Sequence, residues 1–257
     1  MSTSKKITVV VPTYNCGTKL RSCLESVKWV NEIIIVDMGS TDDTLLVAKK
    51  YGAKIIKRFP REGNFDLNRK YGMKMAKSDW ILKLDSDEVL ENELINEIIN
   101  FLKSEDDGSV DGFYLYNKFY LFGKQIKHGF IQRGSNELRL VRKNCWKYNP
   151  YRYHQQLVVD GKKAYLSGYY CHYNYTNVSE FIFKTNKYTE LDASKLTSLI
   201  KINIVYIVLS FPKSFFKFYV IQLGFLDGMI GLVSCFLYAL YYLIEKIKVR
   251  EYVLNKT

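Results

Sequence analysis

The sequence predicts an α/β fold in which a parallel sheet is covered by helices on both faces. Over about the first 100 residues, short apolar runs alternate four times with segments of helical periodicity. Polar residues collect directly after those runs, at the edge where the strands of such a sheet end. The chain has 257 residues, of which 47% are hydrophobic, so it is long enough for one large α/β domain or two small ones.

The predicted elements carry local signals. Most of the strands are short apolar runs rich in valine and isoleucine, as expected where both faces are buried. The first helix places Leu20, Cys23, Leu24 and Val27 at helical spacing, and Gly52 is well placed to end the second. In order, strands are expected at 7–11, 32–36, 54–57 and 80–84, and helices at 19–29, 41–51, 64–76 and 91–103.

The chain changes character after residue 110. Runs at 113–116, 137–141 and 164–166 are typical of strands that extend the sheet. Between Lys118 and Tyr170 there are eleven Lys or Arg residues and only two acids. Such a basic face suits a pyrophosphate or a phosphorylated lipid, although a solvated surface explains it equally well.

Residues 178–257 are expected to form an apolar helical region after an α/β domain at 1–177. Residues 202–244 are strongly apolar, with interruptions at 211–213 and 224–228. The uncharged stretch from Met229 to Ile244 has only 16 residues, whereas a spanning helix needs about 20. Flanking Lys and Arg residues favour helices that lie in the membrane interface. A reentrant hairpin and a buried helical hairpin are the alternatives.

Composition narrows the partners and the compartment. The formal net charge of +12 favours an anionic partner, such as a nucleic acid, a nucleotide or an acidic membrane surface. The five cysteines contain no CxxC, which indicates reduced thiols rather than a zinc ribbon or a disulfide framework. The N-terminus lacks the apolar segment of a signal peptide. We therefore expect a cytoplasmic protein, peripheral to the inner face of the plasma membrane.

Asp85 and Asp87 follow the fourth strand and are the main chemical signal. Two carboxylates one residue apart are costly together unless a cation lies between them. Mg²⁺ or Mn²⁺ binds such oxygens together with substrate phosphates, and neutralises charge on a departing pyrophosphate. In isolation the motif is weak, because Asp87 can equally be a helix cap before Glu91. Its place at the end of a buried strand favours the metal.

Other candidate residues follow the first two strands. Asp37 can accept hydrogen bonds from a ribose hydroxyl or a base N–H, while Ser40 or Thr41 can cap the next helix. Neither GxGxxG nor GxxxxGK[ST] occurs, which argues against a dinucleotide-binding fold and a P-loop kinase. His172, after a short strand, is a candidate third metal ligand, whereas the sequence indicates no specific role for His128.

In combination, these motifs resemble the family 2 inverting glycosyltransferases. The segments that carry this resemblance are 9–15, 35–42 and 76–88. Segments that are similar to the branch of the bacterial lipopolysaccharide-core β-1,4-glucosyltransferases are 24–33, 137–142, 172–173 and 223–228. The resemblance implies a GT-A fold, which is a Rossmann-like mixed sheet flanked by helices. It also implies transfer of a hexose from a UDP-sugar to a glycan or lipid-linked glycan in cell-surface polysaccharide or lipopolysaccharide synthesis.

The resemblance implies roles for individual residues as well. The residues implied to hold the nucleotide sugar are Pro12, Thr13, Asn15, Asp37, Arg69, Lys70 and Asp85. The implied ligands of Mn²⁺ or Mg²⁺ are Asp85, Asp87 and His172. Lys70 stands where relatives have an Asn near the diphosphate.

The sequence leaves the identity of the catalytic base open between two residues. An inverting transfer needs a base that takes the proton of the acceptor hydroxyl. Relatives usually have His-Glu where this chain has His154-Gln155, and a Gln cannot act as a base. His154 and Glu137 are the remaining candidates, with His154 slightly favoured.

Two other classes of protein are alternatives. A metal-dependent nucleotidyltransferase would be expected to have a Gly-rich loop after the first strand, and residues 12–15 do not supply one. A non-catalytic basic protein that binds membranes or nucleic acid explains the charge and the apolar region. It gives no reason for acids at the ends of two buried strands. The prediction is therefore a transferase with a UDP-sugar donor, a glycan or glycolipid acceptor, contact with the cytoplasmic membrane surface and no nucleic-acid partner.

Overall fold

The structure, a computed structural model, describes residues 5–58, 65–104, 108–130, 136–149, 156–196 and 203–254. The chain divides into two compact units. Unit 1 comprises residues 1–117 and 136–172, and unit 2 comprises residues 118–135 and 173–257. The boundary expected after residue 177 stays a prediction.

The main sheet is mixed, and its strand order is β3-β2-β1-β4-β8-β6-β11-β5, with β7 paired to β6. The parallel part consists of β1 (Ile7–Thr13), β2 (Glu32–Asp37), β3 (Lys54–Lys57) and β4 (Trp80–Lys83). The extension consists of β5 (Glu88–Leu90), β6 (Gly112–Leu121), β8 (Asn136–Arg142) and β11 (Lys163–Tyr175). Within it, β8 pairs antiparallel to β4 and β6, and β11 pairs antiparallel to β5. The predicted parallel sheet with a mixed extension is confirmed.

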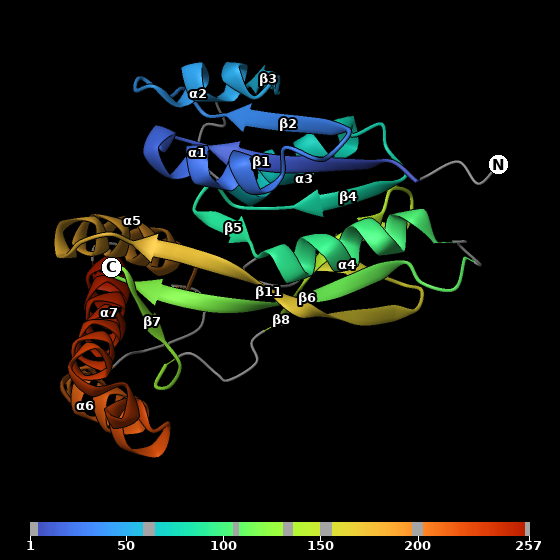
Figure 1. Cartoon of the computed structure of the whole chain (residues 1–257). Helices are drawn as coiled ribbons and strands as arrows, with labels where there is room; N and C mark the ends of the chain where they lie inside the picture. Colours follow the sequence, from blue (N-terminus) through green and yellow to red (C-terminus); the bar gives the residue numbers. More distant parts are fainter. Residues whose placement is uncertain are drawn as a thin grey trace. The chain divides into compact units, whose positions relative to one another are not determined.

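Unit 1 has a hydrophobic core on each face of this sheet. Along β1, Val9 and Val11 belong to one core and Val10 to the other, because successive side chains of a strand point to opposite faces. The first core contains side chains of α1 (Gly17–Ser26), α2 (Thr44–Lys50) and α4 (Asn92–Lys103). The second contains α3 (Phe65–Met75) and the ribbon of β9 (Trp146–Asn149) and β10 (Gln156–Val159). Figure 1 shows α1 and α3 along the parallel strands.

The carboxyl ends of the parallel strands meet at one edge of unit 1. Thr13 at the end of β1 is in register with Asp37 at the end of β2, and β4 runs in the same direction. Gly52 ends α2 with a φ of 67°, as predicted. The short strand β5, which sequence patterns did not reveal, follows the acidic turn and places Glu88 opposite His172 of β11. This edge gathers the predicted polar residues.

Two capping alternatives are wrong. The N-cap of α4 is Glu91 and that of α2 is Asp43, and neither makes a side-chain capping bond. Asp87 is separated from α4 by β5, so it does not cap that helix. Ser40 and Thr41 precede the start of α2 at Thr44, so they do not cap it either. These side chains are therefore available to the site.

Unit 2 is mostly helical. Its elements are β7 (Lys124–Ile126), α5 (Val178–Leu196), α6 (Ile204–Phe216), a π-helix (Lys217–Ile221), a 3₁₀ turn (Gly224–Asp227) and α7 (Gly228–Leu254). The break in apolar character at 211–213 does not end the helix: α6 continues through Pro212 and passes directly into the π-helix. The segments 204–221 and 224–254 are long and apolar enough to cross a membrane, by length and composition alone.

The second interruption, at 224–228, is a turn held by Asp227. Its Oδ2 accepts hydrogen bonds from the backbone N–H groups of Lys127 and His128, at 2.8 Å each. The Nδ1 atom of His128 lies 2.7 Å from Asp227 Oδ1. Both side chains are largely buried within unit 2, at 10% and 6% exposure. His128, which carried no claim from sequence, therefore fixes the turn between two apolar helices.

Candidate active site

The predicted nucleotide-binding residues Thr13, Asn15 and Asp37 form one hydrogen-bonded network. The carboxylate of Asp37 accepts from Thr13 Oγ1 (3.0 Å), Ser40 Oγ (2.5 Å), and the backbone N–H groups of Gly39 (2.9 Å) and Ser40 (3.0 Å). Asn15 donates its backbone N–H to Ser40 Oγ (3.0 Å), and its side-chain oxygen accepts from Thr41 N (2.8 Å). Pro12 lies beside this network within β1, paired with Val36. The turn after β2 is thus fixed against the turn after β1.

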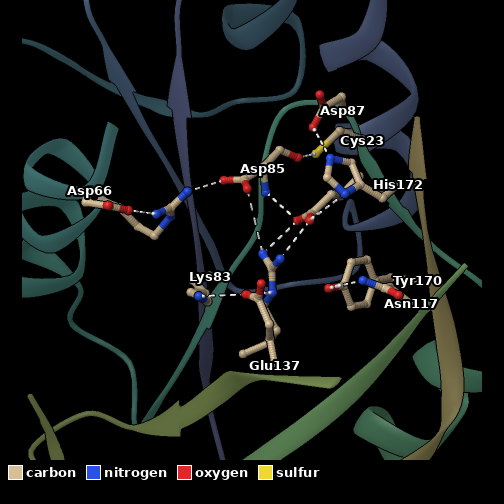
Figure 2. Close-up of polar contacts among 12 residues, drawn as sticks. Cys23, Asp66, Lys83, Asp85, Asp87, Asn117, Glu137, Tyr170 and His172 are labelled. Atoms are coloured by element: carbon tan, nitrogen blue, oxygen red, sulfur yellow. Dashed lines mark hydrogen bonds and ion pairs between the residues drawn. The ribbon is translucent and has the colours of Figure 1, made fainter. Parts of the chain in front are cut away.

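Asp85 follows β4 and is paired with Arg69 of α3. The guanidinium of Arg69 lies 2.5 Å from Asp85 Oδ1 and 2.5 Å from Asp66 Oδ1, so it bridges two carboxylates (Figure 2). Burial would raise the pKa of Asp85, but the charges of Arg69 and Arg139 outweigh it and hold that pKa well below its usual range. Asp85 is therefore ionised, and its closest ion-pair partner is Arg69.

A buried ion pair holds the acidic turn, Asp85-Ser86-Asp87, in place. Arg139 of β8 donates two hydrogen bonds of 2.8 Å to Glu88, and the two side chains are 5% and 0% exposed. Glu88 Oε2 also accepts the backbone N–H of Asp85 at 2.7 Å. The guanidinium of Arg139 stacks on the ring of Tyr170, 4.9 Å from its centroid. This pair connects the turn after β4 to β8 and β11.

Asp87 faces His172 at the outer side of the turn. The Nε2 atom of His172 lies 3.5 Å from Asp87 Oδ1, and its Nδ1 lies 4.0 Å from Glu88 Oε1 (Figure 2). Burial would lower the pKa of His172, but the hydrogen bond and charge of Asp87, with the charge of Glu88, raise that pKa to about 9. A divalent cation that displaced the imidazole proton would find one carboxylate oxygen and one imidazole nitrogen here, with diphosphate oxygens and water as its other ligands.

The three predicted metal ligands are only partly assembled. Asp87 and His172 face each other, whereas Asp85 is engaged by Arg69. Among the described residues, no group of three or more His, Cys, Asp or Glu side chains is arranged to hold a metal ion. The donor chemistry of Asp87 and His172 fits Mn²⁺ or Mg²⁺, and the complete ligand set stays a prediction.

Glu137, one of the two candidate bases, lies between two cations. Its Oε2 is 3.1 Å from Lys83 Nζ and 3.1 Å from Arg139 Nε. The charge of Arg139, helped by Lys83, lowers the pKa of Glu137 to about 2 against the effect of burial. The Glu137 side chain is 52% exposed. It is accessible, but its affinity for a proton is low. His154 and Gln155 lie outside the described residues.

Sequence reasoning missed the buried residues that support this site. Lys83 and Arg139 are 8% and 4% exposed; Lys83 ends the apolar strand β4, and Arg139 stands between Leu138 and Leu140 of β8. A cation within an otherwise apolar run is the signal that could have identified them. Asn68 of α3 is fully buried, and neither of its amide atoms has a hydrogen-bond partner among the described residues. Such groups are candidates for ligand contact.

These features together define the class of protein. An α/β sheet carries an acidic turn at its carboxyl edge, and the buried cations Arg69, Lys83 and Arg139 surround that turn. This arrangement suits an enzyme that binds an anionic nucleotide at the carboxyl edge of its sheet.

The chain belongs to glycosyl transferase family 2, whose family model matches residues 8–180. An uncharacterized glycosyltransferase of Rickettsia typhi is 27% identical over 96% of this chain and 87% of its own length. The lipopolysaccharide core biosynthesis glycosyltransferase LpsC of Rhizobium meliloti is 26% identical over 86% of this chain and 85% of its own. The protein is therefore a glycosyltransferase, and the predicted resemblance is confirmed.

The fold comparison agrees. The crystal structure of S. aureus TarS 1–349 in complex with UDP-GlcNAc covers 98% of this chain and 92% of its own, with a TM-score of 0.50 and 15% sequence identity. At this identity the likeness concerns the fold, which is GT-A as predicted.

Proposed function

We propose that this glycosyltransferase moves a hexose, with inversion, from a UDP-sugar to a glycan or lipid-linked glycan of the cell surface. The observation that carries the proposal is the turn Asp85-Ser86-Asp87, which places one carboxylate against Arg69 and the other against His172. A bound diphosphate is stabilised by a metal cation and by fixed positive groups. Asp87 and His172 would hold the cation, and Arg69 beside Asp85 is a fixed positive group. The name of LpsC supports an acceptor in lipopolysaccharide core synthesis.

In this proposal the residues of the carboxyl edge bind and orient the donor. Pro12, Thr13, Asn15 and Asp37 hold the nucleoside, and Arg69 and Lys70 lie beside the diphosphate. Asp87 and His172, with Asp85 close by, hold Mn²⁺ or Mg²⁺. When bound, that metal would neutralise charge that develops on the leaving diphosphate.

The acceptor hydroxyl attacks the sugar carbon from the face opposite the diphosphate, so the bond to UDP breaks as the new glycosidic bond forms. A base removes the hydroxyl proton during this attack. We keep His154 and Glu137 as the candidates. The low pKa of Glu137 favours His154.

We also propose that unit 2 attaches the protein to the inner face of the plasma membrane, so that the enzyme works on the cytoplasmic side. Support comes from its exposed apolar side chains, among them Val208 at 63%, Ile221 at 66% and Met229 at 75%. Lys213 and Lys217 interrupt the first apolar segment, which favours a position in the interface over a span. The bonds that fix Asp227 to residues 127 and 128 argue against a free reentrant hairpin.

The proposed binding of a UDP-sugar donor can be tested by thermal unfolding of the full chain. We expect Mn²⁺-dependent stabilisation by UDP and none by NAD or RNA. Asp87→Ala should abolish the metal-dependent part, while Glu25→Ala, at an exposed site on α1, should not. If no nucleoside diphosphate stabilises the protein, the proposal fails. Mass spectrometry of products from a panel of UDP-sugars with a membrane glycolipid extract would identify the sugar and the acceptor.

A further inference from the structure

A second polar pocket lies in unit 1, along the flank of α3. It has a volume of about 410 Å³, within the range of small-molecule sites. One wall is α3, with Lys70, Met73 and Lys74 on one helical face, and the other is formed by β9 and the residues that precede it. Its lining does not include Asp85, Asp87 or His172. Of its lining residues, only Lys70 has a place in the proposed donor site, so the rest of the pocket has no role in the proposed chemistry.

Among the residues that the structure describes, the lining is cationic and contains no acid. Four lysines contribute to it, Lys70 and Lys74 from α3, and Lys143 and Lys147 from the segment 143–148. Lys147 is paired with Asp160 at 2.7 Å, and Lys143 Nζ lies 3.4 Å from the backbone oxygen of Lys77. In the part of the chain that the structure describes, neither Lys70 nor Lys74 has an acidic partner. An anion in the pocket would offset the mutual repulsion of these charges.

The remaining wall is aromatic and fixed. Tyr148 is 7% exposed, and its hydroxyl lies 3.5 Å from Met73 Sδ. The ring of Trp146 meets Tyr148 edge-to-face, with centroids 5.8 Å apart. A pocket with lysines around an aromatic wall suits a ligand that has both a phosphate and a carbon ring or chain.

The pocket extends away from the carboxyl edge. Its near end is at Lys70, whose neighbour Arg69 bonds Asp85. Its far end is at Lys143, whose backbone N–H donates to the oxygen of Asp79 at 2.9 Å. Asp79 precedes β4 and Asp85 follows it, so at roughly 3.3 Å per residue these two residues lie about 20 Å apart. A diphosphate at Asp85 leaves the far end of the pocket open.

We propose that this pocket binds the phosphate group of the acceptor, a phosphorylated sugar or polyol unit of the glycan that receives the hexose. The inference rests on the proposed function only in that it makes the ligand an acceptor. The anionic and apolar character of the ligand follows from the lining alone.

Direct binding can be measured through Trp146. The full chain is titrated with glucose 6-phosphate, with glucose as the neutral match and with sulfate at equal ionic strength, while tryptophan fluorescence is recorded. We expect a saturable change with glucose 6-phosphate only, and loss of that change in Trp146→Phe. Lys74→Gln/Lys143→Gln should weaken the apparent affinity by about tenfold or more, because two charge-assisted hydrogen bonds are lost.

The matched control is Lys50→Gln/Lys54→Gln. It removes the same charge from exposed positions on α2 and β3, and the affinity should not change. An equal response to sulfate, or an unchanged affinity in the Lys74/Lys143 variant, would mean a nonspecific basic surface and would overturn the inference. Displacement of glucose 6-phosphate by UDP would also overturn it, because the pocket would then belong to the donor.

Two further arms separate the sources of phosphate and the two hypotheses. Competition by phosphatidylglycerol vesicles would assign the pocket to lipid headgroups and overturn the acceptor assignment, whereas phosphatase treatment of the glycolipid extract should raise the acceptor KM and leave the donor KM unchanged. Thermal stabilisation by UDP is measured on the same preparations. Its absence with intact glucose 6-phosphate binding contradicts the proposed function, and the opposite result contradicts this inference.

Discussion

The parallel part of unit 1 and its antiparallel extension differ in how charge is used. Along the parallel strands, acids stand at the ends: Asp37 is the last residue of β2, and Asp85 follows β4. In the extension, charged residues lie within the strands, as with Glu137 and Arg139 of β8. The first arrangement leaves oxygens at an open edge for a ligand. The second builds a buried set of ion pairs that holds that edge in place.

The largest effect should come from substitution of the catalytic base. The identity of the base decides whether a residue of the extension, Glu137, takes part in the reaction. We expect His154→Ala to lower kcat by roughly 10²–10⁴ and Glu137→Gln to have the smaller effect. Steady-state rates of both variants with a fixed UDP-sugar check this. Full activity in both variants would contradict both assignments.

The pH profile gives an independent reading of the same question. A carboxyl with a pKa of about 2 stays ionised at all higher pH, so a rate governed by Glu137 should be flat down to about pH 4. We expect an acidic limb above that pH, which would belong to a base other than Glu137. The wild type and Glu137→Gln should therefore share the acidic limb.

Next in size is the buried ion pair of the extension that holds the acidic turn, Glu88 with Arg139. Arg139→Met leaves a fully buried carboxylate without its partner, and we expect a loss of about 3–5 kcal/mol in the free energy of unfolding. Urea denaturation checks the value. Arg139→Met/Glu88→Met should recover much of this loss, because no buried charge remains. If the double variant is as unstable as the single one, the pair acts through packing instead.

Substitution of Asp87 tests the role of the carboxyl edge of the sheet. Asp87→Asn keeps the size of the side chain but removes its charge, so the contact with His172 and the affinity for a cation both weaken. We expect kcat to fall by about 100-fold, which is roughly 2.7 kcal/mol, at a stability close to that of the wild type. A loss of folding equal to the loss of activity would instead give Asp87 a structural role.

The difference between the two regions also explains what the sequence could predict. The strands of the parallel part, and the acids that end them, are local patterns, so β1, β2, β4 and the Asp85-Ser86-Asp87 turn were predicted. The pairing of Arg139 with Glu88 joins residues 51 positions apart, and no local period reveals it. The strands β5 and β7 have only three residues each, too few to signal a strand, and the ribbon of β9 and β10 was not predicted either. The prediction of Asp85 as a site residue did not reveal its ion pair with Arg69.

The smallest expected effect concerns the network at the end of β1 and β2. Thr13 is fully buried and donates one of the four hydrogen bonds that Asp37 accepts. Thr13→Val keeps the shape and removes that donor, so we expect a loss of about 1–2 kcal/mol in stability and a weaker stabilisation by UDP. Thr41→Val, at an exposed position whose hydroxyl lies 3.5 Å from Asn15, should change stability by less than about 0.5 kcal/mol. If Thr13→Val loses stability but keeps the full UDP response, the network supports the fold and the nucleoside is bound elsewhere on the edge.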